Sequence, residues 1–450
     1  MSEHKEIRKF SSGNLKKSFK QIKWQKEGKV VRIVGIIIEA NLPDCQLGTI
    51  VEIKSPARDD KVLGEVVGFK EDLVLLLPYS YLNGIAPGCP VAVVNNVTKI
   101  PCSEALLGRV IDPFLNPLSG PNIEVNEYSQ WFKLDAEAPN PLERQRITST
   151  LSLGVRTIDG LLTLGQGQRI GIMAGSGVGK SVLMGMMARN SAADVNVIAL
   201  IGERGREVRE FIEKDLAHSG LAKSVIVTVT SDQSPLMRIR GAKTATTIAE
   251  FFAAQGKNVL LMIDSLTRIA MAQREIGNAV GEPPTTKGYT PSVFSLLPKL
   301  LERAGPQRAG WGSISGLYTV LVDGDDFNDP IVDAARSILD GHINLSRDLA
   351  AKGHFPAIEV TTSASRVMND IANKDHLKIA ARIKELIAVY KENVDLIQIG
   401  AYQSGANPLL DQAIAAKPAI DAFLRQDISE GSRLEDAVIA MKRILSALES

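Results

Sequence analysis

A glycine-rich turn between a short apolar run and a helix-forming segment constrains this chain more than any other feature. Residues 170–182 read IGIMAGSGVGKSV, with three alternate glycines ahead of Lys180 and Ser181. Glycines let successive backbone N–H groups turn inward, and the positive end of the following helix adds to them, so such a turn can surround a triphosphate. Lys180 would then contact the β and γ phosphates, and Ser181 would bind Mg²⁺. The alternative is an ordinary strand-to-helix turn, since Ala174 stands where the formal pattern has its first glycine.

Length, charge and cysteine content limit the classes of protein to consider. A chain of 450 residues is long enough for two or three domains. Its net charge of +1 gives no global reason to bind nucleic acid or a membrane. Cys45, Cys89 and Cys102 are scattered without metal-ligand spacing, as is usual in a reducing cytosol. No apolar run approaches the roughly 18 residues of a spanning helix, and the polar N-terminus does not resemble a signal peptide, so we expect a cytoplasmic protein.

The first part of the chain divides into a basic segment and a β-rich segment. Residues 1–29 carry nine Lys or Arg against three Glu, which is typical either of a solvated tail or of a docking arm for an acidic partner or an anionic membrane surface. Short β-rich runs separated by Gly, Pro and Asp follow over residues 30–98. This spacing predicts a small antiparallel β-barrel, which we interpret as an assembly domain.

The rest of the chain predicts a mostly parallel sheet followed by helices. Residues 101–140 are rich in Pro, Gly and Asn, and we expect them to form a hinge. Apolar runs at 195–201, 225–229, 259–263 and 317–322 are typical of parallel strands buried on both faces. Beyond about residue 370, apolar residues recur at helical spacing. We therefore predict a multidomain α/β protein with a basic tail (1–29), a barrel (30–98), a RecA-like P-loop domain (99–369) and a helical domain (370–450).

Two carboxylates follow predicted strands near the glycine-rich turn. Asp264 ends the apolar run VLLMID, where a carboxylate beside a P-loop can hold Mg²⁺. Glu203 follows the run VNVIALI in the sequence GERGRE, and it could orient a water molecule toward the γ-phosphate. Arg204 could steady the phosphate or Glu203. The alternative is a surface charge cluster.

Longer motifs resemble one family over nearly the whole chain. GERGRE, AGSGVGKS, VLLMIDSLTR and GHFPAIEVTTSASRVM resemble the head subunits of rotary ATP synthases. GVRTIDGLLTLGQGQR, GEPPTTKGYTPSVF and GWGSISGLYTVLVDGDD are more similar to the ATPases of flagellar and virulence type III protein export. The resemblance departs at Glu359, Leu115 and Thr290, where the family has Asp, Gly and Pro.

The resemblance implies a role for each site residue. Lys180, Glu203 and Arg204 match catalytic positions, Asp264 and Ser181 match the Mg²⁺ positions, and Arg366 matches an arginine finger that enters the site of the next subunit. Phe355 matches the aromatic residue that stacks on adenine, and Tyr402 is expected to face it. The ATP phosphates would be bound by Gly175, Ser176, Gly177, Val178, Gly179, Lys180, Ser181 and Val182.

The resemblance also implies partners and a mode of assembly. Because Glu203 and Arg366 occur in one chain, a homohexamer could complete every site. The implied partners are a stator-type regulator at the N-terminus, a central stalk protein, the export gate and chaperone–cargo complexes, with peripheral association at the inner face of the cytoplasmic membrane and no nucleic acid. Two alternatives stay open: a Rho-like nucleic-acid motor and a non-catalytic nucleotide-binding subunit. The sequence does not decide between a flagellar and a virulence system.

Overall fold

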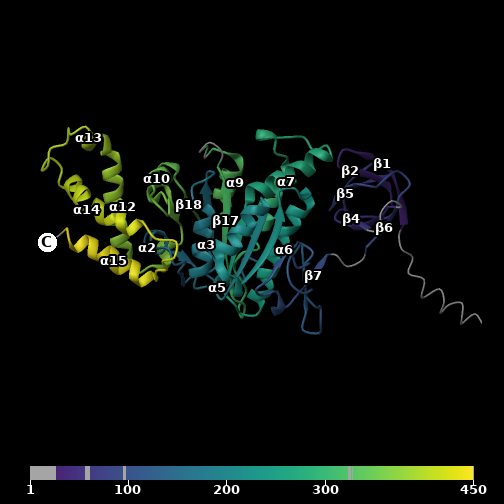
Figure 1. The fold of residues 1–450 in the computed structure, drawn as a ribbon, viewed down its shortest axis with the longest axis horizontal. Helices are drawn as coiled ribbons and strands as arrows, with labels where there is room; N and C mark the ends of the chain where they lie inside the picture. The colour runs from purple at the N-terminus through teal and green to yellow at the C-terminus, as the bar shows by residue number, and fades with distance from the viewer. Residues whose placement is uncertain (1–26, 56–60, 95–97, 323–325, 327, 449–450) are drawn as a thin grey trace, which may run out of the picture. The chain divides into compact units, whose positions relative to one another are not determined.

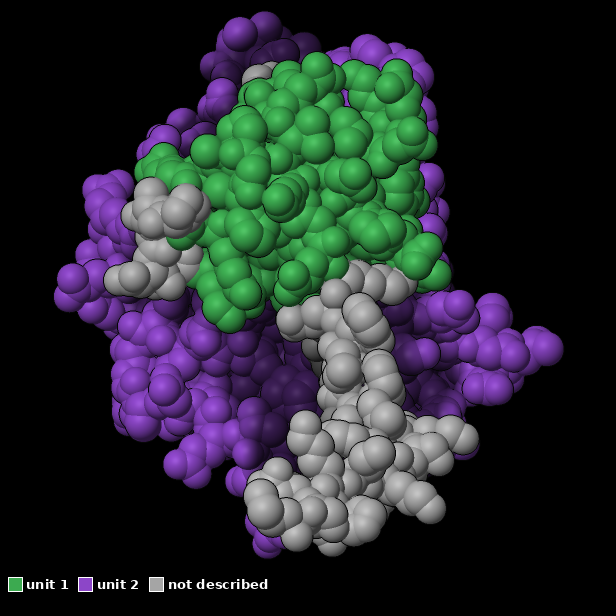
Figure 2. Space-filling model, turned by 90° about the vertical axis from the view of Figure 1, so that its right-hand side faces the viewer, with its two compact units in different colours: residues 1–97 green, residues 98–450 purple. Residues whose placement is uncertain are grey.

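The computed structural model describes residues 27–55, 61–94, 98–322, 326 and 328–448. The chain forms two compact units, Met1–Val97 and Thr98–Ser450, which Figure 2 shows in different colours. All but the last three residues of the predicted basic tail lie outside the described residues, so both interpretations of that tail stay predictions. Among the residues described, no helix combines the length and the apolar character that crossing a bilayer requires.

The first unit contains a closed barrel of six strands in the order β1-β2-β5-β4-β3-β6, in which all neighbours are antiparallel. This confirms the predicted barrel. Apolar residues such as Ile38 and Leu76 alternate into its interior and are fully buried. Gly35, with φ of 58°, makes the tight turn from the first strand to the second. The strands are β1 (Glu27–Val34), β2 (Ile37–Asn41), β3 (Ile50–Lys54), β4 (Lys61–Lys70), β5 (Leu73–Pro78) and β6 (Pro90–Val93).

A sheet with the strand order β19-β18-β12-β17-β15-β13-β14-β8 forms the centre of the second unit (Figure 1). Every pair along this order is parallel except β18 with β19, and the short β16 pairs antiparallel with β17, so the mostly parallel sheet is confirmed. The strands are β8 (Val110–Ile111), β12 (Arg169–Ala174), β13 (Val195–Glu203), β14 (Ser224–Thr230), β15 (Val259–Asp264), β16 (Gly305–Pro306), β17 (Ser313–Leu321), β18 (Gly341–Asn344) and β19 (Ala364–Ser365).

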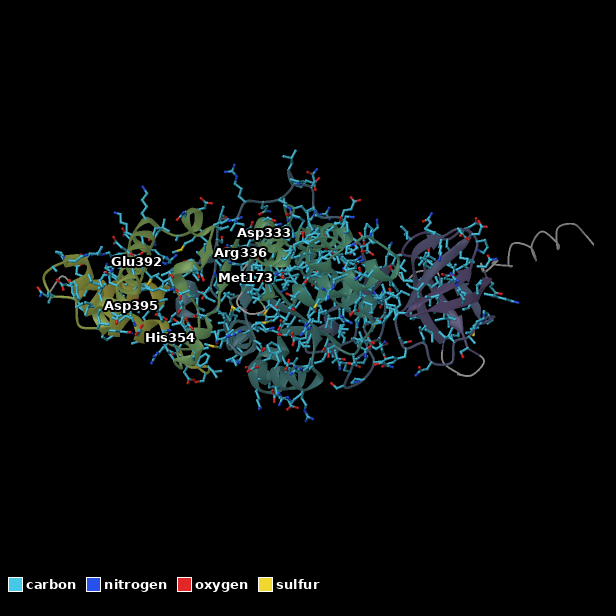
Figure 3. All side chains as sticks on the ribbon, turned by 90° about the horizontal axis from the view of Figure 1, so that it is seen from above. Met173, Asp333, Arg336, His354, Glu392 and Asp395 are labelled. Carbon is cyan, nitrogen blue, oxygen red and sulfur yellow. The ribbon has the colours of Figure 1, made fainter. Side chains whose placement is uncertain are left out.

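Both faces of this sheet are covered, which explains why its strands are apolar on both sides. Ile172 of β12 belongs to a core that also contains α2, α3, α12, α14 and α15, whereas its neighbour Met173 belongs to a core with α6, α7, α8 and α9. The C-terminal helices therefore share a core with the helix that follows the glycine-rich turn. Glu392 and Asp395, labelled in Figure 3, lie at the end of α12 and in α13.

The helices begin where the sequence supplies capping residues. Ser234 accepts a hydrogen bond from the Met237 amide at the start of α6, and Asn373 accepts one from the His376 amide at the start of α12. The helices are α2 (Arg156–Leu161), α3 (Lys180–Asn190), α4 (Gly205–Glu210), α5 (Ala217–Ala222), α6 (Pro235–Ala254), α7 (Leu266–Ala279), α8 (Pro291–Leu301), α9 (Pro330–Ile338), α10 (Arg347–Ala351), α11 (Met368–Ile371), α12 (Lys374–Glu392), α13 (Val394–Gln398), α14 (Pro408–Leu424) and α15 (Leu434–Ser446), with short 3₁₀ or π segments η1 (Glu104–Leu106), η2 (Phe211–Leu216), η3 (Thr286–Gly288) and η5 (Val360–Thr362).

The segment 101–140 is more than the predicted hinge. Its strand β8 joins the central sheet beside β14, and Ile111 of that strand is fully buried. Leu115 has a φ of 68°, the left-handed conformation for which the glycine of the family would be better suited. Two smaller ladders complete the unit: β7 (Lys99–Cys102) with β9 (Gln130–Lys133), and β10 (Thr150–Leu151) with β11 (Leu164–Gly165).

Candidate active site

The glycine-rich turn connects β12 directly to α3, as the sequence predicts. Gly177 and Gly179 have φ values of 77° and 86°, which side chains with a Cβ disfavour. Gly175, Ser176 and these glycines form the loop, and Val178 anchors it because its side chain is buried in the core. Lys180, Ser181 and Val182 then form the first turn of α3. The backbone N–H groups of this helix start are available to an anion.

Lys180 lies between two carboxylates at the carboxyl edge of the sheet. Its ammonium forms an ion pair with Oδ1 of Asp264 and lies 3.7 Å from Oε1 of Glu203. β12, β15 and β13 run in the same direction, so their last residues meet at one edge, and Leu200 of β13 lies opposite Asp264. The topology thus brings together the three residues that the sequence placed after separate strands.

The environment of Glu203 changes its protonation. Burial raises the pKa of Glu203 to about 7, the negative charges of Asp264 and Glu207 act in the same direction, and the Lys180 ammonium opposes them. A carboxylate with a pKa near neutrality can accept a proton from water more readily than an ordinary glutamate.

Arg204 is turned away from this cluster. Its guanidinium lies 3.5 Å from Glu207, and its side chain is 77% exposed. In this conformation Arg204 contacts neither Lys180 nor Glu203 through a described hydrogen bond or ion pair. The predicted role beside the phosphate would require Arg204 to turn inward.

Arg366 lies near the start of β12, at the opposite end of this strand from the P-loop and Lys180. Its amide donates to the carbonyl of Asp340, whose own amide donates to the carbonyl of Arg169, the first residue of β12. Its guanidinium donates to the carbonyls of Leu339 and Arg336, the latter labelled in Figure 3. These bonds hold Arg366 in an exposed position beside the edge strand β19.

The two predicted adenine contacts come from different segments. The Phe355 ring lies beside the P-loop, since a Cβ at Gly179 would approach its edge to 3.3 Å, and 45% of Phe355 is exposed. Tyr402 lies in the loop between α13 and α14, where its hydroxyl donates to Asp411 at 2.9 Å and lies 3.0 Å from the carbonyl of Asn407. No described contact joins Tyr402 to Phe355.

Thr319 is a contact of the site that sequence reasoning missed. This residue of β17 is fully buried, and its hydroxyl donates to Oδ1 of Asp264 at 2.6 Å. The available signal was a threonine, with the hydroxyl of Tyr318 beside it, inside the mostly buried run LYTVLV.

Comparison with known proteins connects this site to one family. The chain matches the nucleotide-binding domain of the ATP synthase alpha/beta family over residues 154–365, its beta-barrel domain over residues 30–93, and the T3SS EscN ATPase C-terminal domain over residues 372–443. The flagellum-specific ATP synthase of Bacillus subtilis is 51% identical over 419 residues, covering 93% of this chain and 95% of the relative. The type 3 secretion system ATPase of Xanthomonas euvesicatoria is 48% identical, covering 91% and 92%.

Solved structures give the same result. The assembled ATPase EscN from the type III secretion system of enteropathogenic E. coli aligns with a TM-score of 0.87 and 49% identity, covering 93% of this chain and 100% of that chain. A second EscN structure, in complex with its central stalk EscO, aligns with a TM-score of 0.85 and 48% identity, with the same coverage. These relatives are ATPases of protein secretion, so the Rho-like and non-catalytic alternatives are set aside. The chain therefore belongs to the ATPases of flagellar and type III protein export, a branch of the ATP synthase alpha/beta family.

Proposed function

We propose that this chain hydrolyses ATP at the subunit interfaces of a homohexameric ring and couples hydrolysis to chaperone release and to the unfolding and delivery of export substrates. The observation that carries the proposal is the separation of Lys180 and Arg366. Arg366 is bonded through Asp340 to the first residue of β12, whereas Lys180 follows the turn after its last residue. The strand rises about 16 Å between these ends. An arginine finger at this position serves a neighbouring copy more readily than its own chain.

The residues of one copy have distinct roles at an interface. The P-loop backbone and Lys180 bind the phosphates, Glu203 orients and deprotonates the attacking water, and Arg204 supports the phosphate after turning inward. Phe355 stacks on adenine, and Tyr402 approaches it from the helical domain (370–450). Arg366 of the adjacent copy neutralises the charge that develops on the transferring phosphoryl group.

A magnesium ion fits the donors at this edge of the sheet. Ser181 supplies a hydroxyl and Asp264 a carboxylate, which are hard oxygen donors of the kind that Mg²⁺ prefers. When bound with ATP, the ion neutralises phosphate charge. Ser181 and Asp264 would hold it, while Lys180 leaves Asp264 for the phosphates.

The relatives suggest the partners. EscN has been solved assembled and with the central stalk EscO, which supports a ring around a stalk for this chain as well. We extend the proposal to a stator-type regulator bound to the N-terminal segment, to the export gate, and to chaperone–cargo complexes. The protein would then work in the cytoplasm at the inner face of the cytoplasmic membrane, with the barrel (30–98) holding the ring together.

The test is complementation between two defective variants. R366A keeps Glu203 but lacks the finger, and E203Q keeps the finger but lacks the base. Each alone should hydrolyse little ATP. If copies mix at random in a closed ring, about a quarter of the interfaces regain both groups, and hydrolysis should return in proportion. A mixture no faster than the sum of its separate variants would overturn the shared site.

A further inference from the structure

We propose that Thr319 is a positioning residue for hydrolysis: its hydroxyl holds the Asp264 carboxylate in place when Lys180 moves from Asp264 to the phosphates. This inference rests on the proposed function, because it assumes that Asp264 holds Mg²⁺ and that Lys180 binds phosphate. Its evidence is a separate set of contacts on β17, a strand for which no role in the chemistry was predicted from the sequence.

The position of β17 explains why one of its residues can serve both neighbours. In the sheet it lies between β12, which leads into the P-loop, and β15, which ends in Asp264. Thr319 is paired with Ile172 of β12. The end of β17 is also fastened to α7, because the Leu321 amide donates to Oγ1 of Thr267 at 2.9 Å. The hydroxyl of Thr319 is therefore carried by a strand that is fixed on both sides.

The hydroxyl and the ammonium share one oxygen of Asp264. Oδ1 accepts from Thr319 Oγ1 at 2.6 Å and is also ion-paired with Lys180. Asp264 is 3% exposed and Thr319 is fully buried, so water contributes little to holding this carboxylate. Short O–H···O⁻ bonds of this length are among the stronger hydrogen bonds in proteins.

The two partners of Asp264 differ in mobility. Lys180 sits on a flexible four-carbon stem, and its proposed role requires its ammonium to leave Oδ1. Thr319 is β-branched, which restricts its χ1 angle, so its hydroxyl stays directed at Oδ1. Because Thr319 engages Oδ1, the second oxygen of Asp264 is left for the metal. Without the hydroxyl, a buried carboxylate that has lost its ammonium would have to reorient.

Two comparisons separate the effect of losing the hydroxyl from the effect of a change in packing. The first is the wild type against T319V, which keeps the branched shape and removes the donor, and the second is T319S against T319A. T319S and T319A both lose the methyl group, but only T319A also loses the hydroxyl. The matched control is T228V, since Thr228 is a buried threonine of β14 whose Oγ1 has no hydrogen-bond partner among the described residues. Full-length chains are used throughout.

Two measurements are made on each variant. The first is kcat and KM for ATP. The second is the affinity for a non-hydrolysable ATP analogue by calorimetry, with Mg²⁺ and with EDTA. We expect T319V and T319A to lower kcat about tenfold and to reduce the Mg²⁺-dependent gain in analogue affinity by a similar factor, with affinity in EDTA unchanged. T319S should stay within about threefold of the wild type, and T228V should match it.

The outcomes are distinct. A T319V protein with wild-type kcat and a wild-type Mg²⁺-dependent gain would overturn the inference, even if E203Q is inactive and the proposed function stands. If T319V melts well below the wild type, T319S against T319A supplies the comparison, and equal behaviour of those two would also overturn it. Wild-type hydrolysis by E203Q would instead contradict the proposed function.

Discussion

Two groups of buried charges in the second unit show the difference between a structural ion pair and a site prepared for chemistry. Arg303 donates to both oxygens of Glu250, at 2.7 and 2.8 Å, and also to Thr247 Oγ1 and the Leu134 carbonyl, each at 2.8 Å. One positive charge meets one negative charge in bidentate geometry, and the guanidinium is bonded on all three nitrogens. This group fastens α6 to the segments around Leu134 and Arg303.

The group around Lys180 has the opposite balance. One ammonium is shared by two carboxylates, Asp264 and Glu203, and burial together with the excess negative charge raises the pKa of Glu203 to about 7. Lysine is also a less specific partner than arginine, because its charge sits on a flexible stem. The pair of Arg303 and Glu250 is therefore arranged to stay as it is, whereas the site is arranged to be changed by a ligand that draws Lys180 away.

Removing the Glu203 carboxylate from the group around Lys180 should change activity more than any other substitution considered. E203Q should lower kcat about 10² to 10⁴-fold, because the variant loses the base that activates water, while binding of an ATP analogue persists. Steady-state hydrolysis and calorimetry would measure the two properties. The matched control is E213Q, since Glu213 is an exposed acid paired with Arg209 at 2.8 Å on the following helical segment. Equal losses in E203Q and E213Q would contradict the assignment.

Breaking the ion pair of Arg303 and Glu250 should instead affect stability. E250Q leaves the Arg303 guanidinium buried without its counter-ion, which should cost about 3–5 kcal/mol in the free energy of unfolding of the second unit. Urea titration followed by tryptophan fluorescence or circular dichroism would measure it, with E213Q again as the control. If E250Q unfolds at the same urea concentration as the wild type, the pair does not fasten α6.

The raised pKa of Glu203 predicts how activity and stability depend on pH. Since the pKa of Glu203 is raised to about 7, kcat/KM should fall as pH drops through 7, where Glu203 takes up a proton. The raised pKa of Glu203 also affects the stability of the folded chain. Because ionising Glu203 is unfavourable in the folded state, Glu203 contributes stability that is fully present below its ordinary pKa and is lost as pH rises through about 7.

The E203Q variant isolates this contribution to stability. Glutamine cannot ionise, so the variant should melt at a higher temperature than the wild type at pH 8.5 and by a smaller margin at pH 5.5. Thermal unfolding at the two pH values measures the margin. A margin that is equal at both values, or an acid limb of kcat/KM near pH 4.5, would show that Glu203 titrates like an ordinary glutamate.

Local patterns predicted the parts of the fold that local physics decides. The barrel followed from short β-rich runs separated by Gly, Pro and Asp, and the P-loop followed from glycines, two of which, Gly177 and Gly179, have positive φ values in the structure. The edge of the sheet where Lys180, Asp264 and Glu203 meet followed from the rule that parallel strands end together. Their detailed partners did not follow.

The features that sequence reasoning missed depend on pairing between distant segments. β8 is two residues long and belongs to the sheet only through β14, more than 100 residues later, so nothing local distinguished it from a hinge. Thr319 reaches Asp264 because β17 inserts between β12 and β15, an order that the run LYTVLV does not reveal. The place of Arg366 depends on the antiparallel pairing of β19 with β18.

A third kind of buried polar group, one without a hydrogen-bond partner among the described residues, should matter least. Thr228 is 6% exposed, and its hydroxyl has no hydrogen-bond partner among the described residues. Burying an unpaired hydroxyl costs free energy that a methyl group at the same position does not, so T228V should stabilise the second unit by about 0.5–1 kcal/mol. The midpoint of urea unfolding should rise slightly while kcat stays unchanged, since β13 separates Thr228 on β14 from Asp264 on β15. A T228V protein less stable than the wild type would mean that Oγ1 of Thr228 has a hydrogen-bond partner in solution. Thr228 would then not be an example of a buried polar group without a partner.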